Sequence, residues 1–539
     1  MHPRSANPAI IIISLSHPAI STAPGGQPIT TLTTSIATMT SVDEILDGRY
    51  PAKAHAKAVA DYLRSRHPSL TDGIIFLESA KSGHHEDCDQ ELSPRQRRPF
   101  FYLTGCNLLD SYVVYSIASQ KLTLYIPPVN PASVLWSGLP LSPQDAQERY
   151  DVDEVRTTDQ LDTDIRALQA AVTPDQPLFV IPTQVCRSFD QQGPGSLITS
   201  ALKCAIDECR ALKDSYEVAL IKKANTITTA AHEAVMAAVT SAKNEREMLA
   251  VFTERCISLG APTQAYTGIF GAGRSAATLH YVHNNQPLEG KLNLLLDAGA
   301  EVDNYASDVT RTFPISGKFS KESGEIYNLV LRMQKECLEL SKPGQNWDDV
   351  HVHAHRVAIQ GLLELGILKG GSVEEILESR TSCAFLPHGL GHYLGMDTHD
   401  TGGNPNYEDS DKMFCYLRKR GPLPEGAVIT VEPGVSPAHL NVWMGANARE
   451  IYFCEFIIRP YLNDPMHAKF IDEQVLDRYW DVGGVRIEGG LFARWRREGM
   501  PANVGFADNI LITRDGYENL TTTIKEVEDV ERVVNSGAK

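Results

Sequence analysis

The chain has 539 residues, enough for two or three domains, and its 42% hydrophobic and 22% charged residues are ordinary for a folded globular protein. A formal net charge of −17 argues against nucleic-acid binding, because contacts to phosphate groups need clustered Lys and Arg. No apolar run approaches the ~18 residues of a membrane span, so we expect no membrane partner.

Residues 1–40 are rich in Ser, Thr, Pro, Ala and Ile, with one basic residue, Arg4, and no acidic residue before Asp43. This composition partly resembles a mitochondrial transit peptide, but Arg is sparse and the apolar run 10–13 is too short for a signal peptide. We expect either a disordered extension or a translation start at Met39. The ten cysteines are dispersed without CxxC pairs, which favours reduced, mostly buried thiols and a cytoplasmic protein, with a mitochondrial location as the alternative.

The next stretch, residues 41–203, predicts an amino-terminal α/β domain. A helical pattern over 52–66 precedes four apolar runs at 73–77, 100–103, 112–115 and 122–126, which we interpret as strands. Residues 84–89 (HHEDCD) could be mistaken for a metal cluster, but neighbouring side chains cannot all face one ion, so we expect a surface loop. We also expect a solvated loop for the densest basic run, residues 95–98 (RQRR).

A second domain is predicted over residues 204–530, followed by a tail at 531–539. It opens with helical patterns at 214–239 and 245–259. Further along, His351, His353 and His355 alternate in a predicted helix, where the first and last share a face. With no third ligand nearby in the sequence, we interpret them as exposed helix residues.

Two carboxylates frame a predicted hairpin in this second domain. Asp297 ends the apolar run 292–296, and Asp308 follows a turn-like stretch, 298–304, so a hairpin would bring both onto adjacent strands. Like charges at short range resist joint ionisation unless cations or hydrogen bonds compensate them. A pair of divalent ions bridged by carboxylates is a common solution.

Three more candidate ligands follow in glycine-punctuated segments. His392 lies in residues 387–395 (PHGLGHYLG), Glu432 in 429–434 (ITVEPG) and Glu488 in 483–488 (GGVRIE). We expect Gly389, Gly391 and Gly395 to permit close backbone approach and positive φ. A set of oxygen donors with one imidazole suits Mn²⁺ better than a thiolate-bound structural zinc.

In this order the motifs resemble those of the pita-bread dinuclear metallopeptidases, in the branch of Xaa-Pro aminopeptidases and prolidases, over roughly residues 41–530. The resemblance implies an α/β (α+β) protein whose pita-bread catalytic domain follows the amino-terminal domain. It also implies that the protein is a homodimer with two Mn²⁺ ions per subunit. The implied metal ligands are Asp297, Asp308, His392, Glu432 and Glu488, and the outer residues are His280, His388, His399 and Arg486.

The resemblance also implies roles for these side chains. Asp308 and Glu488 would bridge the metals, Asp297 would chelate one, and His392 would complete the other with Glu432. Glu432 would accept the proton of the attacking water. His388 and His399 would hydrogen-bond the scissile carbonyl or the developing oxyanion, and His280 would line the substrate pocket. Arg486 would orient the carboxylates from the face of the strand that carries Glu488.

The implied function is hydrolysis of the bond between an N-terminal residue and a penultimate proline in peptides. A prolidase restricted to dipeptides and a non-catalytic binding module with this fold are the alternatives. Two stretches, 435–450 and 489–507, are extra relative to the family. The amino acids of both stretches can be encoded by DNA that begins with GT and ends with AG, as an intron does. The two stretches are therefore either retained introns or genuine surface loops.

Overall fold

The computed structural model describes residues 41–68, 70–171, 177–185, 197–198, 200–435, 455–483, 485 and 507–537. Arg486 and Glu488 therefore lie outside the described residues. So do the predicted extension 1–40 and nearly all of the two extra stretches, so the expectations for them stay predictions.

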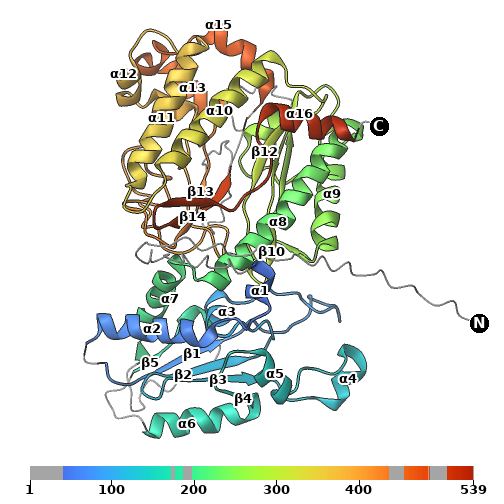
Figure 1. Ribbon diagram of the computed structural model, residues 1–539, viewed down its shortest axis with the longest axis vertical. Helices are drawn as coiled ribbons and strands as arrows, with labels where there is room; N and C mark the ends of the chain where they lie inside the picture. Colours follow the sequence, from blue (N-terminus) through green and yellow to red (C-terminus); the bar gives the residue numbers. More distant parts are fainter. Residues whose placement is uncertain are drawn as a thin grey trace, which may run out of the picture. The chain divides into compact units, whose positions relative to one another are not determined.

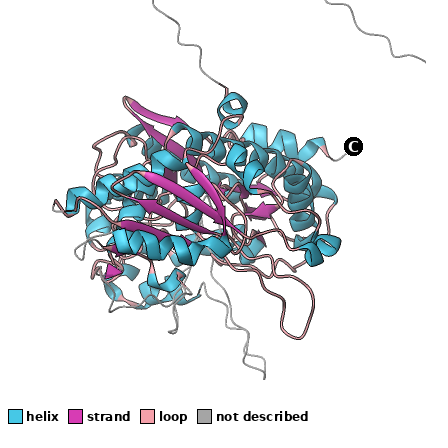
Figure 2. Cartoon of the chain, turned by 90° about the horizontal axis from the view of Figure 1, so that it is seen from below, coloured by secondary structure: helices cyan, strands magenta, loops and turns pink. Residues whose placement is uncertain are grey.

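The amino-terminal part of the described chain is built on a six-stranded sheet with strand order β4-β3-β2-β1-β5-β6. Strands β1 to β3 pair antiparallel, and the remaining pairs are parallel. Figure 2 shows helices beside the strands. The elements are α1 (Val42–Leu46), α2 (Ala52–Arg66), β1 (Ile74–Glu78), α3 (Arg98–Thr104), β2 (Tyr112–Ser116), β3 (Lys121–Ile126), α4 (Pro131–Ser137), α5 (Pro143–Arg149), β4 (Glu154–Thr157), α6 (Leu161–Ala171), β5 (Leu178–Phe179) and β6 (Leu197–Ile198).

Strand β1 is buried on both faces of this sheet. Because successive side chains of a strand point to opposite faces, Ile75 and Leu77 join the large hydrophobic core, whereas Ile74 and Phe76 pack into a separate cluster. The continuous apolar run of β1 is thus explained by a strand covered on both sides.

The predicted strand at 100–103 is wrong, because these residues belong to helix α3. The helix has Pro99 in its first turn and is followed directly by Gly105, which has a φ of 64°. Proline at the start and glycine just past the end are typical of a helix. A short apolar run does not by itself distinguish a strand from a buried helix, and these two flanking residues were the available signal.

The described residues of the carboxyl-terminal part form three three-stranded sheets, ordered β11-β10-β7, β12-β9-β8 and β13-β14-β15. Figure 1 shows β12 between α8 and α9 on one side and α10 and α11 on the other, with β13 drawn below α10 and α11. The elements are α7 (Ala201–Ala211), α8 (Ser215–Ala238), α9 (Glu245–Ser258), β7 (Thr263–Gln264), β8 (Ile269–Ala272), β9 (Asn293–Asp297), β10 (Ala300–Val302), β11 (Tyr305–Ala306), β12 (Thr310–Pro314), α10 (Lys321–Leu340), α11 (Trp347–Glu364), α12 (Val373–Glu378), β13 (Val428–Val431), α13 (Glu455–Asn463), α14 (Pro465–Ala468), α15 (Glu473–Leu476), β14 (Asp508–Thr513), β15 (Gly516–Asn519) and α16 (Val527–Ser536).

Helix α11 carries the three alternating histidines, and the prediction that they are exposed is wrong for two of them. His351 and His355 are fully buried. Nε2 of His351 lies 2.7 Å from the carbonyl oxygen of Met413, and Nδ1 of His355 lies 2.8 Å from Oγ of Ser382. Burial lowers the pKa of His351 to about 4, so the imidazole is neutral and can be buried once it has a polar partner.

The two polar runs of the amino-terminal part differ from each other in burial. Residues 84–89 are exposed, which confirms the surface loop. The solvated loop predicted for residues 95–98 is wrong, because Gln96 and Arg98 are buried. Arg98 begins α3 and pairs with carboxylates far away in the sequence, which is why local composition did not reveal its burial.

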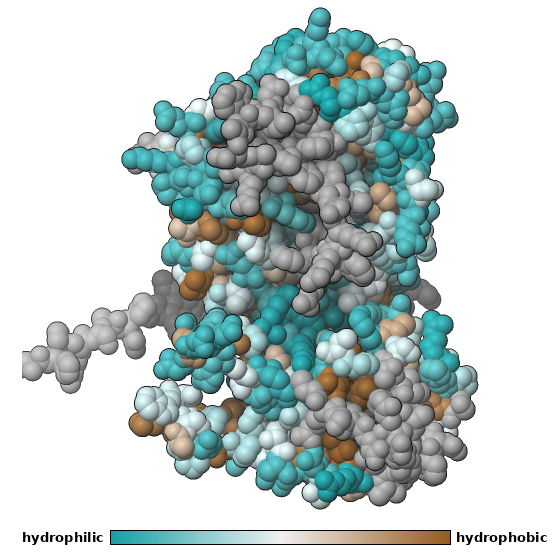
Figure 3. All heavy atoms as spheres, turned by 180° about the vertical axis from the view of Figure 1, so that it is seen from behind, coloured by the Kyte–Doolittle hydropathy of each residue, from teal (hydrophilic) through white to brown (hydrophobic). Residues whose placement is uncertain are grey.

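The cysteines and the surface of the described residues agree with a folded core. All eight described cysteines are free thiols, and half of them are buried: Cys106, Cys256, Cys337 and Cys383. Among the described helices, none is both long and apolar enough to cross a membrane. Hydrophilic side chains predominate among the described residues visible in Figure 3.

Candidate metal centre

The predicted hairpin brings Asp297 and Asp308 together. Strand β9 pairs antiparallel with β12, and Asp297 lies opposite Thr310, two residues after Asp308. Between them, β10 and β11 form a second, tight hairpin. Its two turn residues, Asp303 and Asn304, have positive φ values of 43° and 67°, the left-handed conformation that a two-residue hairpin turn requires. Both site carboxylates are fully buried.

Tyr266, in the loop between β7 and β8, connects these two carboxylates. Its hydroxyl oxygen lies 2.6 Å from Oδ1 of Asp297 and 2.8 Å from Oδ1 of Asp308. Burial and the two negative charges raise the pKa of Tyr266 well above its usual value, so the hydroxyl stays a donor. Sequence reasoning missed this residue, because a single tyrosine in a loop carries no motif.

The segment that carries His392 runs beside β13, whose end carries Glu432. The N–H of Glu432 donates to the carbonyl of Leu390 at 2.7 Å, and the N–H of Thr430 donates to the carbonyl of His392 at 2.9 Å. A Cβ on Gly391 would lie 2.0 Å from the Thr430 carbonyl oxygen, so only glycine fits there. The predicted close approach is confirmed.

The positive φ predicted for the three glycines of this segment is wrong. Gly389, Gly391 and Gly395 are all described, and none has a positive φ. These glycines are required because a side chain would clash with neighbouring atoms. Near the site, Asp303 and Asn304 in the β10–β11 turn do adopt the left-handed conformation.

Asp308, His392 and Glu432 form a buried cluster. Nε2 of His392 lies 2.7 Å from Oε1 of Glu432 and 3.5 Å from Oδ2 of Asp308. Among the described residues, none of these three atoms has a hydrogen-bond partner of acceptable geometry. Nδ1 of His392 donates to the carbonyl of Tyr393 at 2.9 Å, so Nε2 is the ring nitrogen that faces the carboxylates.

The electrostatics of the cluster call for a cation. Burial is the main cause that raises the pKa of Asp308, and the nearby charges of Asp297 and Glu432 raise it further. For His392, burial lowers the pKa, but Glu432 and Asp308 outweigh burial and raise it. Buried polar atoms without hydrogen-bond partners are rare in folded proteins. Two carboxylate oxygens and one imidazole nitrogen form a ligand set that fits a hard or borderline divalent metal ion.

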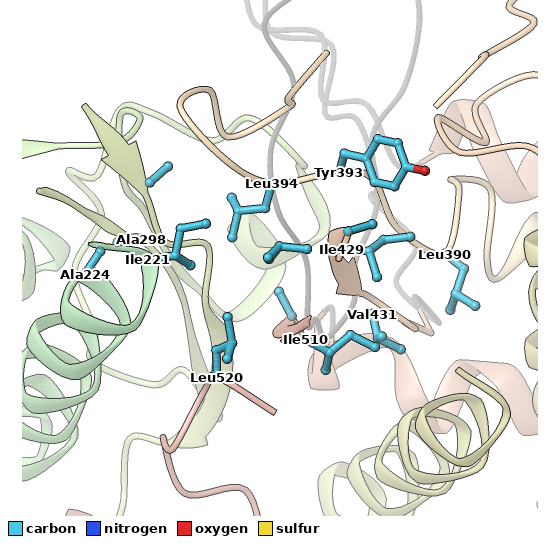
Figure 4. Packing of buried hydrophobic residues seen from close by; sticks show 14 of the residues in the cluster. Ile221, Ala224, Ala298, Leu390, Tyr393, Leu394, Ile429, Val431, Ile510 and Leu520 are labelled. Carbon is cyan, nitrogen blue, oxygen red and sulfur yellow. The ribbon is translucent and has the colours of Figure 1, made fainter. Parts of the chain in front are cut away.

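The strands that carry the ligands are held in place by hydrophobic side chains on their opposite faces, which pack into the core. Ile429 and Val431 alternate with Thr430 and Glu432 along β13, and both are fully buried. Figure 4 shows them beside Leu390 and Ile510, with Ala298, the neighbour of Asp297, nearer helix α8. Because the interior is closely packed, these contacts limit how far the ligand side chains can shift.

Asn509, the second residue of β14, holds the backbone of Asp308 from the other side. Its Oδ1 accepts the N–H of Asp308 at 3.1 Å, and its Nδ2 donates to the carbonyl of Asp308 at 2.6 Å. Sequence reasoning did not identify Asn509 as part of the site. Its only signal is the position directly after the second extra stretch, at the start of an apolar strand.

The predicted outer histidines lie at different depths. His388 is buried, with Nδ1 donating to the Gly389 carbonyl at 2.9 Å. His399 packs edge-on against His392, with 4.3 Å between ring centroids. Burial, followed by the charge of His392, lowers the pKa of His399. His280 is exposed. The described part of the site thus brings together Asp297, Asp308, His392, Glu432 and His399.

Comparison with known proteins gives matches over nearly the whole described chain. Residues 219–491 match metallopeptidase family M24, and residues 55–174 match the aminopeptidase P N-terminal domain. A probable Xaa-Pro aminopeptidase of Tuber melanosporum is 60% identical over 495 residues, covering 92% of this chain and 99% of that protein. One from Pyricularia oryzae is 54% identical, covering 92% and 98%. Among solved structures, E. coli aminopeptidase P has a TM-score of 0.69 at 25% identity, covering 90% of this chain and 99% of that one.

Proposed function

The chain belongs to metallopeptidase family M24, and we propose that it is an Xaa-Pro aminopeptidase, which hydrolyses the bond between an N-terminal residue and a penultimate proline. The observation that carries the proposal is the buried trio of Asp308 Oδ2, His392 Nε2 and Glu432 Oε1, which have no hydrogen-bond partners among the described residues. A non-catalytic relative would not need to keep such a set of donors buried together.

The proposed ligands of two divalent ions are Asp297, Asp308, His392, Glu432 and Glu488, and we propose Mn²⁺ because oxygen donors dominate the set. Bound ions would polarise the peptide carbonyl and lower the pKa of the attacking water. Tyr266 is compatible with this arrangement. Its hydroxyl contacts only Oδ1 of Asp297 and Oδ1 of Asp308, so it does not occupy Oδ2 of either carboxylate.

The remaining proposed roles belong to side chains around the ligands. Glu432 accepts the proton of the attacking water through a carboxylate oxygen. His388 and His399 donate hydrogen bonds to the scissile carbonyl or the developing oxyanion, a contribution of about 3 kcal/mol per donor. His280 lines the substrate pocket, and Arg486 orients Glu488.

The assembly, domain limits and location are part of the same proposal. We propose a homodimer, with domains at 41–203 and 204–530, in the cytoplasm. The free thiols of all eight described cysteines support a reducing compartment. Light scattering of the purified protein tests the dimer, and a fluorescent fusion tests the location.

Activity is tested with Gly-Pro and Gly-Pro-Xaa peptides after chelation and re-addition of Mn²⁺ or Zn²⁺. Metal-restored cleavage of the longer peptide, lost in Asp308→Ala, would support the aminopeptidase. Asp515→Ala is the matched control, because Asp515 is exposed in the turn between β14 and β15. Cleavage of Gly-Pro alone would indicate a prolidase instead.

A chain without residues 435–450 and 489–507 separates the two explanations of the extra stretches. If only the shortened chain cleaves peptides, the stretches interfere with the site and the intron hypothesis gains support. If neither chain cleaves either peptide with any metal, the proposed activity is wrong.

A further inference from the structure

We propose that Arg98 and Arg210 are positioning residues, which act on the reaction by holding the loop that carries His399. The inference rests on the proposed function, since it takes His399 to be part of the peptidase site. Both arginines come from outside the catalytic sheets: Arg98 begins α3 and Arg210 lies near the end of α7.

The loop in question is residues 393–400, which fold back on themselves. The N–H of Asp400 donates to the carbonyl of Tyr393 at 2.8 Å, and the N–H of Gly395 donates to the carbonyl of Asp397 at 3.1 Å. The Gly395 carbonyl in turn accepts the N–H of Ala306 at 2.8 Å. His399 therefore lies between two acidic residues, Asp397 and Asp400, in a tightly closed loop.

Arg210 joins these two acidic residues directly. One of its terminal nitrogens lies 2.8 Å from Oδ2 of Asp397 and 2.7 Å from Oδ1 of Asp400. Lys213 adds a contact of 2.7 Å to the other oxygen of Asp400. The side chains of Arg210, Lys213 and Asp400 are 3%, 1% and 1% exposed, so water does not substitute for these partners.

Arg98 connects the same loop to the hairpin of the metal centre. Its Nε lies 3.4 Å from Oδ1 of Asp397, and a terminal nitrogen lies 2.6 Å from Oε2 of Glu301 in β10. It also donates to Oδ1 of Asn304 in the β10–β11 turn. Arg95 contacts the same two carboxylates from an exposed position, at 2.9 Å and 3.2 Å.

Among the described residues, loss of Arg98 would leave buried Glu301 with only the exposed Arg95 as a charged partner. It would also remove the buried link between Glu301 and Asp397, which keeps Arg210 and Arg95. Removing one partner of a buried ion pair is strongly unfavourable, because the other charge stays buried. The loop can relieve this by shifting towards solvent, and His399 would move with it. A displacement of about 1 Å in a group that orients substrate can reduce the rate by on the order of 10²-fold.

The test compares Arg98→Met with Arg156→Met in the full chain. Arg156 is a matched control, because it is also an amino-terminal arginine paired with two carboxylates, Glu154 at 2.8 Å and Asp164 at 2.7 Å. With Gly-Pro-Xaa as substrate, we expect Arg98→Met to lower kcat at least tenfold, with KM within twofold and metal content unchanged. Arg156→Met should leave all three unchanged. Arg98→Lys should recover part of kcat, because it keeps the charge but not the fork of donors.

Two further readouts separate positioning from a general structural effect. Hydrogen exchange of the peptide spanning 393–400 should be faster in Arg98→Met than in the wild type or in Arg156→Met. In a His399→Gln background, Arg98→Met should change kcat less than twofold, since its effect passes through His399.

An equal loss of kcat in both backgrounds, or unchanged exchange in the loop, would overturn the inference. The hydrogen-exchange measurement also distinguishes failure of this inference from failure of the proposed peptidase function. If the wild-type protein cleaves no Xaa-Pro peptide, the proposed function fails, whereas the exchange comparison still decides whether Arg98 holds the loop.

Discussion

Among the described residues, two clusters contain the same residue types and differ most in how their ligand atoms are hydrogen-bonded. His55, Asp214 and Glu217 form one, and Asp308, His392 and Glu432 form the other; in each, the possible ligand atoms lie within 4.8 Å of one another. In the first cluster, Nε2 of His55 lies 2.9 Å from Oδ2 of Asp214, and Nδ1 lies 2.9 Å from the Tyr102 carbonyl.

The carboxylates of this first cluster are also paired. Oδ1 of Asp214 accepts the N–H groups of Tyr216 and Glu217 at the start of α8, at 2.8 Å and 2.9 Å. Glu217 accepts the Tyr305 hydroxyl at 2.9 Å and the N–H of Asp214 at 3.0 Å. The first cluster is a helix cap joined to an ion pair, whereas the second keeps three ligand atoms without such partners. Residue type and spacing therefore do not identify a metal site until the hydrogen bonds of each atom are counted.

The largest expected difference concerns the glutamates. Glu432→Gln should lower kcat/KM by on the order of 10³-fold and reduce the bound metal, because it removes a charged ligand. Glu217→Gln makes the same chemical change in the other cluster and should leave the metal content unchanged. Metal analysis and peptide cleavage of the two purified variants provide the measurement. Loss of metal from Glu217→Gln would contradict the distinction between the clusters.

The tyrosines give the next largest effect. Tyr266→Phe removes the donor shared by Asp297 and Asp308, and we expect a loss of about 10- to 100-fold in metal affinity or activity. Tyr305→Phe removes the donor to Glu217 and should instead lower the free energy of unfolding by about 1 to 3 kcal/mol, with activity retained. Metal titration and denaturant unfolding distinguish the two. An active, fully metal-loaded Tyr266→Phe protein would show that the tyrosine does not support the ligands.

The smallest effect is the pH dependence of stability at His55. Burial lowers the pKa of His55, but the hydrogen bond and charges from Asp214 and Glu217 outweigh burial and raise it. A raised pKa means that the stabilisation is fully present below about pH 6.5, the unfolded value, and is lost as the pH rises through the folded value. The difference in unfolding free energy between wild type and His55→Gln should therefore shrink from pH 6 to pH 9. A constant difference would show that His55 does not ionise in this cluster.

The predictable part of the site lies in short, local patterns. The hairpin of Asp297 and Asp308 and the glycine-rich segment of His392 could be predicted, because strand ends, turns and close approaches leave a local signature. Tyr266 and Asn509 could not, because their importance depends on contacts across the fold. The basic run at 95–98 was misjudged for the same reason: Arg98 and its partner Glu301 are 203 residues apart.

The register of β14 has a consequence for engineering of the chain. Asp508 is fully buried and pairs with Arg311 at 2.8 Å, and Asn509 grips the Asp308 backbone. Strand β14 is also paired with both β13 and β15, and buried Ala507 just before it bridges Thr310 and accepts a hydrogen bond from Arg311 at 3.2 Å. An insertion between Ala507 and Asp508 would therefore disturb the strand that anchors the metal-site hairpin, so a reporter peptide should not be placed at this junction.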